Sequence, residues 1–264
     1  MIALRAFAFN VFFMTWTASL AVLYLLLLPF PWRVMFASVT WWARTVLWVL
    51  KHFIGLDYVV RGQENLPAGA AIVAAKHQSA WDTVAISVLL RYPSVVLKRE
   101  LFMIPVWGWH ARHCGMIAVD RGAGAAALKS MVKGAKARAA EGRKIVIFPQ
   151  GTRTAPGDKR PYFPGVAALY SQLDLPVVPV ALNSGLFWGR RAFTKLPGMI
   201  VVEFLPPIPP GLKRADFMAE LEQRIEAASD RLIAEAGADR GGKTTGKPAT
   251  AVDNPVDQGP PADS

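Results

Sequence analysis

The sequence predicts an α/β protein in which helices cover a mixed, largely parallel sheet of about seven strands, preceded by a two-helix membrane anchor. Three observations predict it. The first 56 residues are strongly apolar and carry no acidic side chain; from residue 57 onward, short Val/Ile-rich runs alternate with longer amphipathic ones; and the C-terminal residues are rich in Gly, Pro, Ala and Thr. The predicted division is therefore an anchoring hairpin at 1–56, an α/β domain at 57–237 and a disordered tail at 238–264.

Composition and charge narrow the class of protein. The 264 residues suffice for one large domain with appendages, and a 53% hydrophobic content with nine Trp excludes a disordered chain. Thirty basic against nineteen acidic residues leave a net charge of +11, which suits an anionic membrane surface. A nucleic-acid partner is disfavoured, because the basic stretch 129–138 lacks interleaved aromatic residues. The single cysteine, Cys114, excludes an intramolecular disulfide and a cysteine zinc site, and favours a reducing compartment.

The N-terminal hairpin begins with an uncharged run from Ala6 to Pro31, longer than the roughly 20 residues that a membrane-spanning helix needs. The second segment, 34–50, is rich in Trp but has Arg44 near its middle, a costly position at the bilayer centre. We therefore expect 34–50 to lie at the interface, paired with the first helix. Two full spans, a cleaved signal peptide and a buried hairpin of a soluble protein are the alternatives, although Leu23–Leu28 continues the apolar run past any cleavage site.

The remaining elements alternate. Helical spacing predicts helices over 80–91, 124–141, 165–173 and 215–236. Pro179 inside the sixth predicted strand indicates an edge or a bulge. The predicted strands are rich in Val and Ile and are bounded by Gly, Pro or charge: Tyr58–Val60, Ala71–Ala75, Val95–Leu97, Met116–Val119, Lys144–Phe148, Val177–Leu182 and Ile200–Phe204.

A histidine and an aspartate follow the second predicted strand. His77 comes at its carboxyl end and Asp82 lies in the first turn of the next helix, at the sheet edge where ligand sites of α/β proteins gather. Across such a turn the carboxylate can orient the imidazole and make it a general base for a hydroxyl. A capping aspartate beside a surface histidine is the plainer alternative. Ser79 is close in sequence but lacks a nucleophile elbow, so a covalent serine mechanism is disfavoured.

Basic residues follow three other predicted strands. Lys98 comes after the third strand and Arg121 after the fourth, each suited to an anion or to a plain surface role. Residues 101–109 offer an apolar wall, bent by Pro and Gly, for an acyl chain.

The third predicted strand end with a basic residue is that of the fifth strand, which is followed by Gly151, Thr152 and Arg153. Gly151 lets the backbone approach a ligand, and Thr152 and Arg153 present donors that suit a phosphate. The alternative is a loop shaped by Pro149 and Gly151, with Arg153 paired with Asp158.

Taken together and in order, four blocks resemble the motifs of the glycerolipid acyltransferases, and most closely those of the 1-acylglycerol-3-phosphate acyltransferase (PlsC-type) family. The resemblance covers about residues 58–205 and is specific, because the four blocks occur in the family's order at sensible spacing. The blocks are His77-x4-Asp82, Lys98-x-Glu100-Leu101-x3-Pro105-x2-Gly108, Phe148-Pro-x-Gly-Thr-Arg153 and Val178-Pro-Val-Ala181.

The resemblance implies transfer of a fatty acyl group from acyl-CoA or acyl-carrier protein to the sn-2 hydroxyl of lysophosphatidic acid, giving phosphatidic acid. It makes His77 the base and Asp82 its partner, and the hydroxyl attacks the thioester directly, without an acyl-enzyme. No cofactor or metal is implied beyond the acyl donor. The N-terminal hairpin resembles the family's anchor, which would hold the catalytic domain on the cytoplasmic face of the inner or plasma membrane. The implied acceptor site consists of Lys98, Arg121, Gln150, Gly151, Thr152 and Arg153.

One position departs from the family pattern. The third block usually reads Phe-Pro-Glu-Gly-Thr-Arg, and here position 150 is Gln, which retains an acceptor oxygen but loses the charge. Either the enzyme tolerates an amide there and uses lysophosphatidic acid, or the acceptor differs, for example a lyso-ornithine lipid. A membrane protein that binds lipids without turnover is the competing function from another class.

Overall fold

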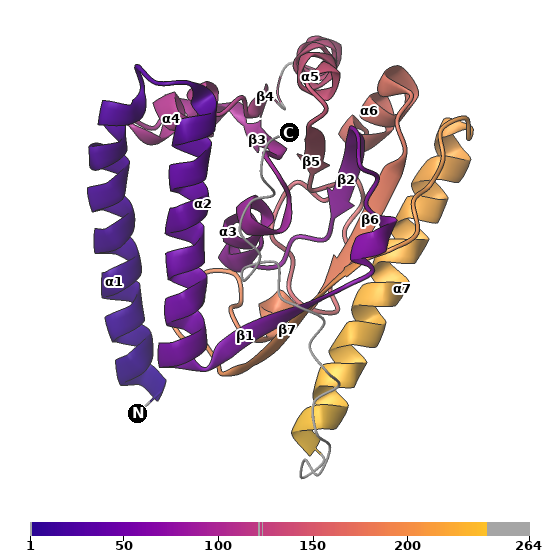
Figure 1. The fold of residues 1–264 in the computed structure, drawn as a ribbon. Helices are drawn as coiled ribbons and strands as arrows, with labels where there is room; N and C mark the ends of the chain where they lie inside the picture. The colour runs from indigo at the N-terminus through magenta and orange to yellow at the C-terminus, as the bar shows by residue number, and fades with distance from the viewer. Residues whose placement is uncertain (1, 121, 123, 242–264) are drawn as a thin grey trace.

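The computed structural model describes residues 2–120, 122 and 124–241, and its centre is a seven-stranded sheet in the order β1-β7-β6-β2-β5-β3-β4 (Figure 1). β7 pairs with β6 in the antiparallel sense, and every other neighbouring pair is parallel. The predicted fold class, a largely parallel sheet covered by helices, is confirmed. The strands are β1 (Leu56–Arg61), β2 (Ala71–Ala75), β3 (Ser94–Lys98), β4 (Ile117–Val119), β5 (Lys144–Ile147), β6 (Val177–Leu182) and β7 (Gly198–Phe204).

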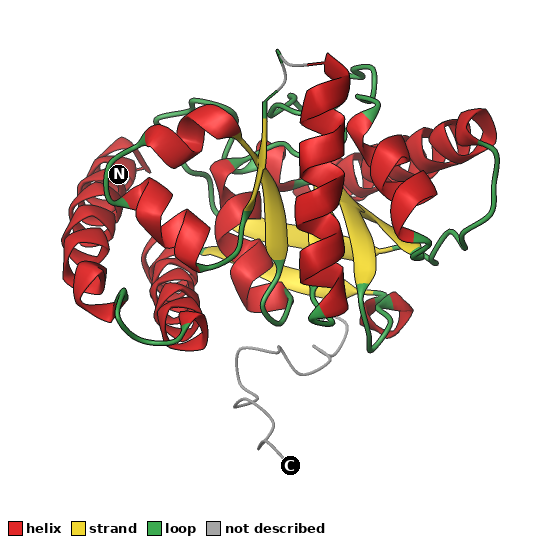
Figure 2. Cartoon of the chain, turned by 90° about the horizontal axis from the view of Figure 1, so that it is seen from above, coloured by secondary structure: helices red, strands yellow, loops and turns green. Residues whose placement is uncertain are grey.

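Side chains of the sheet alternate between two apolar cores. In β2, Val73 and Ala75 pack into one core and Ile72 and Ala74 into the other, as the two-residue period of a strand requires. Both faces of the sheet are covered by helices, which Figure 2 shows from above. The first core is closed by α2 (Trp32–Val49) and α3 (Ala80–Leu89), and the second by α5 (Gly124–Ala140), α6 (Gly165–Leu173) and α7 (Arg214–Gly241).

The N-terminal hairpin lies against the first of these cores. α1 (Ile2–Leu23) and α2 run side by side and are joined through a short 3-10 turn at Tyr24–Leu27 (Figure 1). Phe9 of α1 and Val46 of α2 are fully buried in the same core as the sheet. The segments 1–56 and 57–237 are therefore distinct along the chain but share one apolar core.

Three details differ from the sequence-based expectations. Helix α4 (Trp107–His113) was not expected, because Pro105 and Gly108 suggested only a bent loop. β6 lies between β7 and β2, so an edge position for Pro179 is wrong; Pro179 pairs with Ala74 of β2, and its carbonyl accepts from Leu205. Helix α7 continues to Gly241, and the predicted tail beyond it lies outside the described residues.

Candidate active site

The carboxyl ends of β2, β3 and β5 meet at one edge of the sheet. These strands are parallel neighbours, so the residues that follow them are brought together although they are far apart in sequence. The edge collects His77 after β2, Lys98 at the end of β3 and the loop after β5. In that loop Gly151 has a φ of +64°, a left-handed conformation that glycine adopts without strain. The topology thus assembles the predicted site.

His77 and Asp82 are in direct contact, as the sequence predicted. The Nδ1 atom of His77 lies 2.8 Å from Oδ2 of Asp82. The turn between them is fixed by a capping box, in which the Ser79 hydroxyl accepts from the backbone N–H of Trp81 and Asp82 accepts from the backbone N–H of Ser79. Helix α3 therefore begins at a point that aims the carboxylate back toward the histidine ring.

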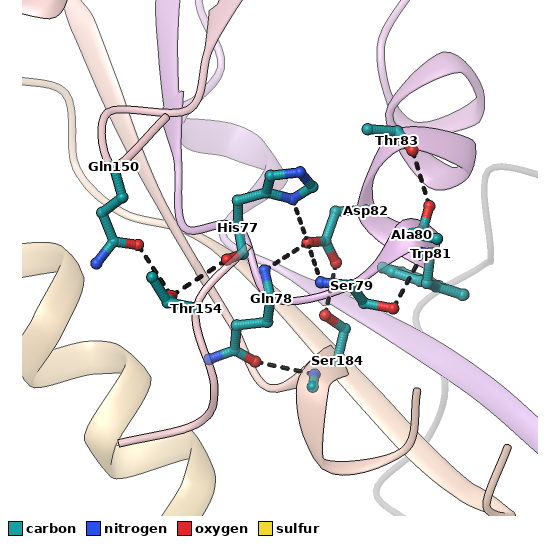
Figure 3. Close-up of polar contacts among 11 residues, drawn as sticks. His77, Gln78, Ser79, Ala80, Trp81, Asp82, Thr83, Gln150, Thr154 and Ser184 are labelled. Carbon is teal, nitrogen blue, oxygen red and sulfur yellow. Dashed lines mark hydrogen bonds and ion pairs between the residues drawn. The ribbon is translucent and has the colours of Figure 1, made fainter. Parts of the chain in front are cut away.

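Asp82 is only 4% exposed, and its charge is stabilised by further donors. The backbone N–H groups of Gln78 and Ser79 each donate to Oδ2 at 2.8 Å. The hydroxyl of Ser184, which follows β6, donates to Oδ1 at 2.5 Å, and Figure 3 shows it below the carboxylate. Sequence reasoning missed Ser184: it lies 102 residues from Asp82, and no local pattern marks it.

The contacts of His77 define its chemical state. Because Asp82 is a carboxylate that can only accept, the shared proton belongs to Nδ1, and Nε2 keeps a free lone pair. The imidazole stacks on the ring of Phe148 at a centroid distance of 4.1 Å and an interplanar angle of 23°, which restricts its rotation. His77 is thus held in the tautomer that a general base requires.

A cavity of about 520 Å³ opens beside His77, and cationic side chains line it. Lys98, Gly151, Thr152 and Arg153, all predicted as acceptor-binding residues, contribute to its wall. Arg190 and Arg191, from the segment after β6, also line it and were missed, because only the tertiary fold brings them here. Among the described lining residues there is no carboxylate, so the cavity suits an anionic ligand.

Arg153 is partly buried, and its surroundings change the pKa of its guanidinium group. Burial lowers the pKa of its guanidinium, the charge of Asp82 raises it in part, and nearby Arg190 lowers it further. Among the described residues, neither Arg153 nor Lys98 has a hydrogen-bond or ion-pair partner at its charged group. The alternative, an ion pair between Arg153 and Asp158 of the same loop, is therefore not found among the described residues. Arg121 lies outside the described residues, and its role stays a prediction.

Gln150 lies in the predicted loop but does not line this cavity. Its side chain is buried: its Nε2 donates to Glu226 of α7 at 3.3 Å, and its Oε1 accepts from the hydroxyl of Thr154 at 3.1 Å. The Thr154 hydroxyl also lies 3.2 Å from the carbonyl oxygen of His77 (Figure 3), and the backbone N–H of Thr154 donates to the same carbonyl at 2.8 Å. The structure therefore places Gln150 on the far side of the loop from the predicted acceptor.

Comparisons with known proteins agree with this geometry. A family model described as Acyltransferase matches residues 57–183. The 1-acyl-sn-glycerol-3-phosphate acyltransferase of Pseudomonas aeruginosa is 36% identical over 209 residues, 79% of this chain and 81% of that protein. The chain belongs to the acyltransferase family.

More distant relatives extend the comparison. The human 1-acyl-sn-glycerol-3-phosphate acyltransferase alpha is 28% identical over 203 residues, which cover 75% of this acyltransferase and 72% of the human protein. The crystal structure of the 1-acyl-sn-glycerophosphate acyltransferase PlsC from Thermotoga maritima superposes with a TM-score of 0.72. The superposition covers 89% of this chain and 98% of that one, at 22% sequence identity. At that identity the likeness establishes the fold.

A second cavity of about 520 Å³ in this acyltransferase is mostly apolar. It runs between the N-terminal hairpin and the catalytic domain, and it shares Thr83, Leu97, Leu101 and Arg153 with the first cavity. The predicted apolar wall at 101–109 contributes to it through Leu101, Ile104 and Trp107. The other lining residues come from α1 and the turn after it, from α2 and α3, from the start of β3 and from the segment around α4, and include Leu20, Tyr24, Phe36, Trp42, Val84, Val95, Ala111 and Cys114.

Two potential nucleophiles of the acyltransferase are unsuited to that role. Ser79 is fully buried, and its oxygen caps α3. Cys114 is 3% exposed, and burial raises the pKa of its thiol to about 12, so the reactive thiolate is scarce at neutral pH. Within the described parts of the chain, no group of three or more His, Cys, Asp or Glu side chains could hold a metal ion, and the absence of a cofactor stays a prediction.

Proposed function

We propose that this protein is a 1-acyl-sn-glycerol-3-phosphate acyltransferase in which His77 acts as general base and Asp82 orients it. The observation that carries the proposal is the 2.8 Å contact between His77 Nδ1 and a buried carboxylate, at the edge of a cavity lined by cations. The contact leaves Nε2 free to accept a proton, and the cations supply attraction for a phosphate. The orientation of His77 by Asp82 favours an enzyme over a lipid-binding protein without turnover, because binding alone does not require a base.

The proposed reaction has two steps that balance without a cofactor. Nε2 of His77 removes the proton of the sn-2 hydroxyl as that oxygen attacks the thioester carbonyl carbon, and the charge of Asp82 stabilises the imidazolium that forms. The tetrahedral intermediate then collapses, the carbon–sulfur bond breaks, and His77 returns the proton to the leaving thiolate. The products are the phosphatidic acid and the free thiol of CoA or acyl-carrier protein, and the enzyme returns to its starting state.

The two cavities divide the substrates between them. The phosphate of lysophosphatidic acid would lie against Lys98 and Arg153, while the apolar cavity would hold a fatty acyl chain. Because the cavities share residues beside His77, a carbonyl at their junction is within reach of an acceptor hydroxyl. Arg190 and Arg191 extend the positive surface toward which an anionic donor, acyl-CoA or acyl-carrier protein, would be attracted.

Membrane attachment follows from the N-terminal hairpin. Residues Ile2–Leu27 form a helix long and apolar enough to cross a membrane, and only 11% of its apolar window is buried within the protein. We propose that this face lies in a phospholipid bilayer, so that a lysolipid enters from one leaflet while the catalytic domain faces the cytoplasm. Large apolar residues exposed on the hairpin include Leu4, Phe7, Val11, Met14, Val22, Leu23, Leu26, Trp41 and Trp48.

An acyl-transfer assay on the purified full chain tests the proposal. Radiolabelled acyl-CoA and acyl-carrier protein are each offered with lysophosphatidic acid and, in parallel, with lyso-ornithine lipid. We expect the label in phosphatidic acid. We also expect the His77→Ala variant to lose about 10²–10⁴-fold in rate, since that is the usual contribution of a general base.

The outcomes separate the alternatives. Undiminished transfer by His77→Ala would show that His77 is not the base. Label in the ornithine lipid would show that the acceptor is a lyso-ornithine lipid and not lysophosphatidic acid. If neither product were labelled with either donor, the result would favour a lipid-binding protein without turnover. Melting curves of both proteins ensure that a loss of rate in the variant is not a loss of fold.

A further inference from the structure

A buried polar cluster lies behind the site, and the proposed reaction does not use it. Lys76, the residue before His77, is 2% exposed, and its ammonium group donates to both carboxylate oxygens of Glu226, at 2.8 and 2.7 Å. Glu226 belongs to α7 and is 7% exposed. A salt bridge at this depth loses the solvation of both ions, and leaving either partner alone would be strongly destabilising.

Gln150 completes the hydrogen bonding of this carboxylate. Oε1 of Glu226 accepts from Lys76, from the Tyr162 hydroxyl at 2.9 Å and from Nε2 of Gln150 at 3.3 Å. Burial and the charge of Glu226 raise the pKa of Tyr162, so its hydroxyl keeps its proton and stays a donor. The cluster contains one cation, one anion and neutral donors, and is electrically balanced.

The cluster is connected to the backbone of His77 from two directions. Lys76 is covalently adjacent to it. From the other side, the backbone N–H of Thr154 donates to the His77 carbonyl at 2.8 Å. The Thr154 hydroxyl lies within hydrogen-bond distance of that same carbonyl, at 3.2 Å, and of Oε1 of Gln150, at 3.1 Å. A displacement of Gln150 would thus be passed through Thr154 to the strand end that carries the base.

We propose that Gln150 and Glu226 are a matched pair of positioning residues: the neutral amide at 150 is required by the carboxylate on α7, and together they hold His77 in place. Residue 150 then acts on turnover through His77 and does not select the acceptor. A glutamate at 150, as in the usual family pattern, would put a second carboxylate beside Glu226 with one lysine to neutralise both. This inference rests on the proposed function and assigns a role to the one position that departs from the motif.

Exchanging the two side chains tests the pairing. The variants are Gln150→Glu, Glu226→Gln and the double variant, in which amide and carboxylate change places and the charge of the cluster is restored. Gln223→Glu is the matched control, because it makes the same chemical change at an exposed position of the same helix. Measured quantities are kcat, the KM for lysophosphatidic acid and the melting temperature of each full-length protein.

We expect Gln150→Glu to lower kcat about tenfold, since a displacement well below 1 Å at the base suffices for that. Its acceptor KM should change less than about twofold, because the side chain does not reach the cavity. Both single variants should melt at a lower temperature than the parent protein. The double variant should recover most of the kcat and most of the melting temperature, and Gln223→Glu should match the parent.

Two results would overturn the inference. One is a double variant no more active and no more stable than Gln150→Glu. The other is a Gln150→Glu variant with an intact kcat and a raised acceptor KM, which would make residue 150 a ligand of the acceptor. If Gln150→Glu does not fold, recovery of a folded, active double variant still supports the pairing, and failure of both overturns it. A parent protein without His77-dependent transfer would instead refute the proposed function, while the melting temperatures would still measure the coupling.

Discussion

The anionic and the cationic side chains of the site differ in how many hydrogen-bond partners they have. In the turn after β2, Asp82 accepts hydrogen bonds from the His77 ring, two backbone N–H groups and the Ser184 hydroxyl. At the ends of β3 and β5, the charged groups of Lys98 and Arg153 have no such partner among the described residues and face the cavity. The proposed base is therefore oriented in the absence of a substrate, whereas the two cations are available to an anion.

This difference in hydrogen bonding predicts that substitutions near Asp82 and substitutions of Arg153 have different effects on the kinetics. A carboxylate buried as deeply as Asp82 needs donors to remain charged, and the donors that stabilise it also fix its position. Changes around Asp82 should therefore alter turnover. In the proposed reaction Arg153 gains a partner when the acceptor binds, so changes there should alter acceptor affinity.

The largest effect is expected from Asp82→Asn. An amide is nearly isosteric, but it is neutral and presents a donor as well as an acceptor, so it neither stabilises an imidazolium nor enforces the Nδ1–H tautomer. We expect kcat to fall by about 10²–10⁴-fold, with little change in the acceptor KM. Steady-state kinetics with varied lysophosphatidic acid measure both. A raised KM with a normal kcat would contradict the assignment of Asp82 to the base.

The next effect is expected from Arg153→Ala. A hydrogen bond between charged groups contributes about 1.5–3 kcal/mol, so the acceptor KM should rise about 10- to 100-fold. Arg153→Lys should recover part of the loss, because it retains the charge but not the bidentate geometry.

Arg99→Ala is the matched control for this prediction. Its side chain is 66% exposed, is paired with Asp120 and lies outside both cavities, so the acceptor KM should stay at the parent value. If Arg153→Ala changed only the KM for the acyl donor, the phosphate would have to bind elsewhere in the cavity.

The sequence predicted the parts of the site that are set by local structure. Every predicted strand overlaps an observed one, because short Val/Ile runs bounded by Gly, Pro or charge are a local signal. His77 and Asp82 meet because a strand end and a helix start are adjacent in the chain. The parallel sheet then brings Lys98 and Arg153 to the same edge.

The remaining contacts depend on tertiary structure. Ser184, Arg190 and Arg191 reach the site because β6 pairs with β2, a strand more than a hundred residues earlier, and no periodicity reports that pairing. The sequence also does not report in which direction the Gln150 side chain points. It depends on the turn at Gly151 and on a buried glutamate of α7, so the motif alone suggested an acceptor ligand.

The smallest of these effects, about tenfold or less in kcat, is expected from Ser184→Ala. The variant removes one donor from Asp82 and leaves three, so the carboxylate stays in place but moves more freely. The acceptor KM should stay within about twofold of the parent value, because Ser184 contacts Asp82 and does not line the cavity. Ser229→Ala removes a hydroxyl that is equally buried but lies on α7 and has no bonding partner in the described residues, and it should leave kcat unchanged. An unchanged kcat in Ser184→Ala, with a lower melting temperature alone, would reduce Ser184 to a packing role.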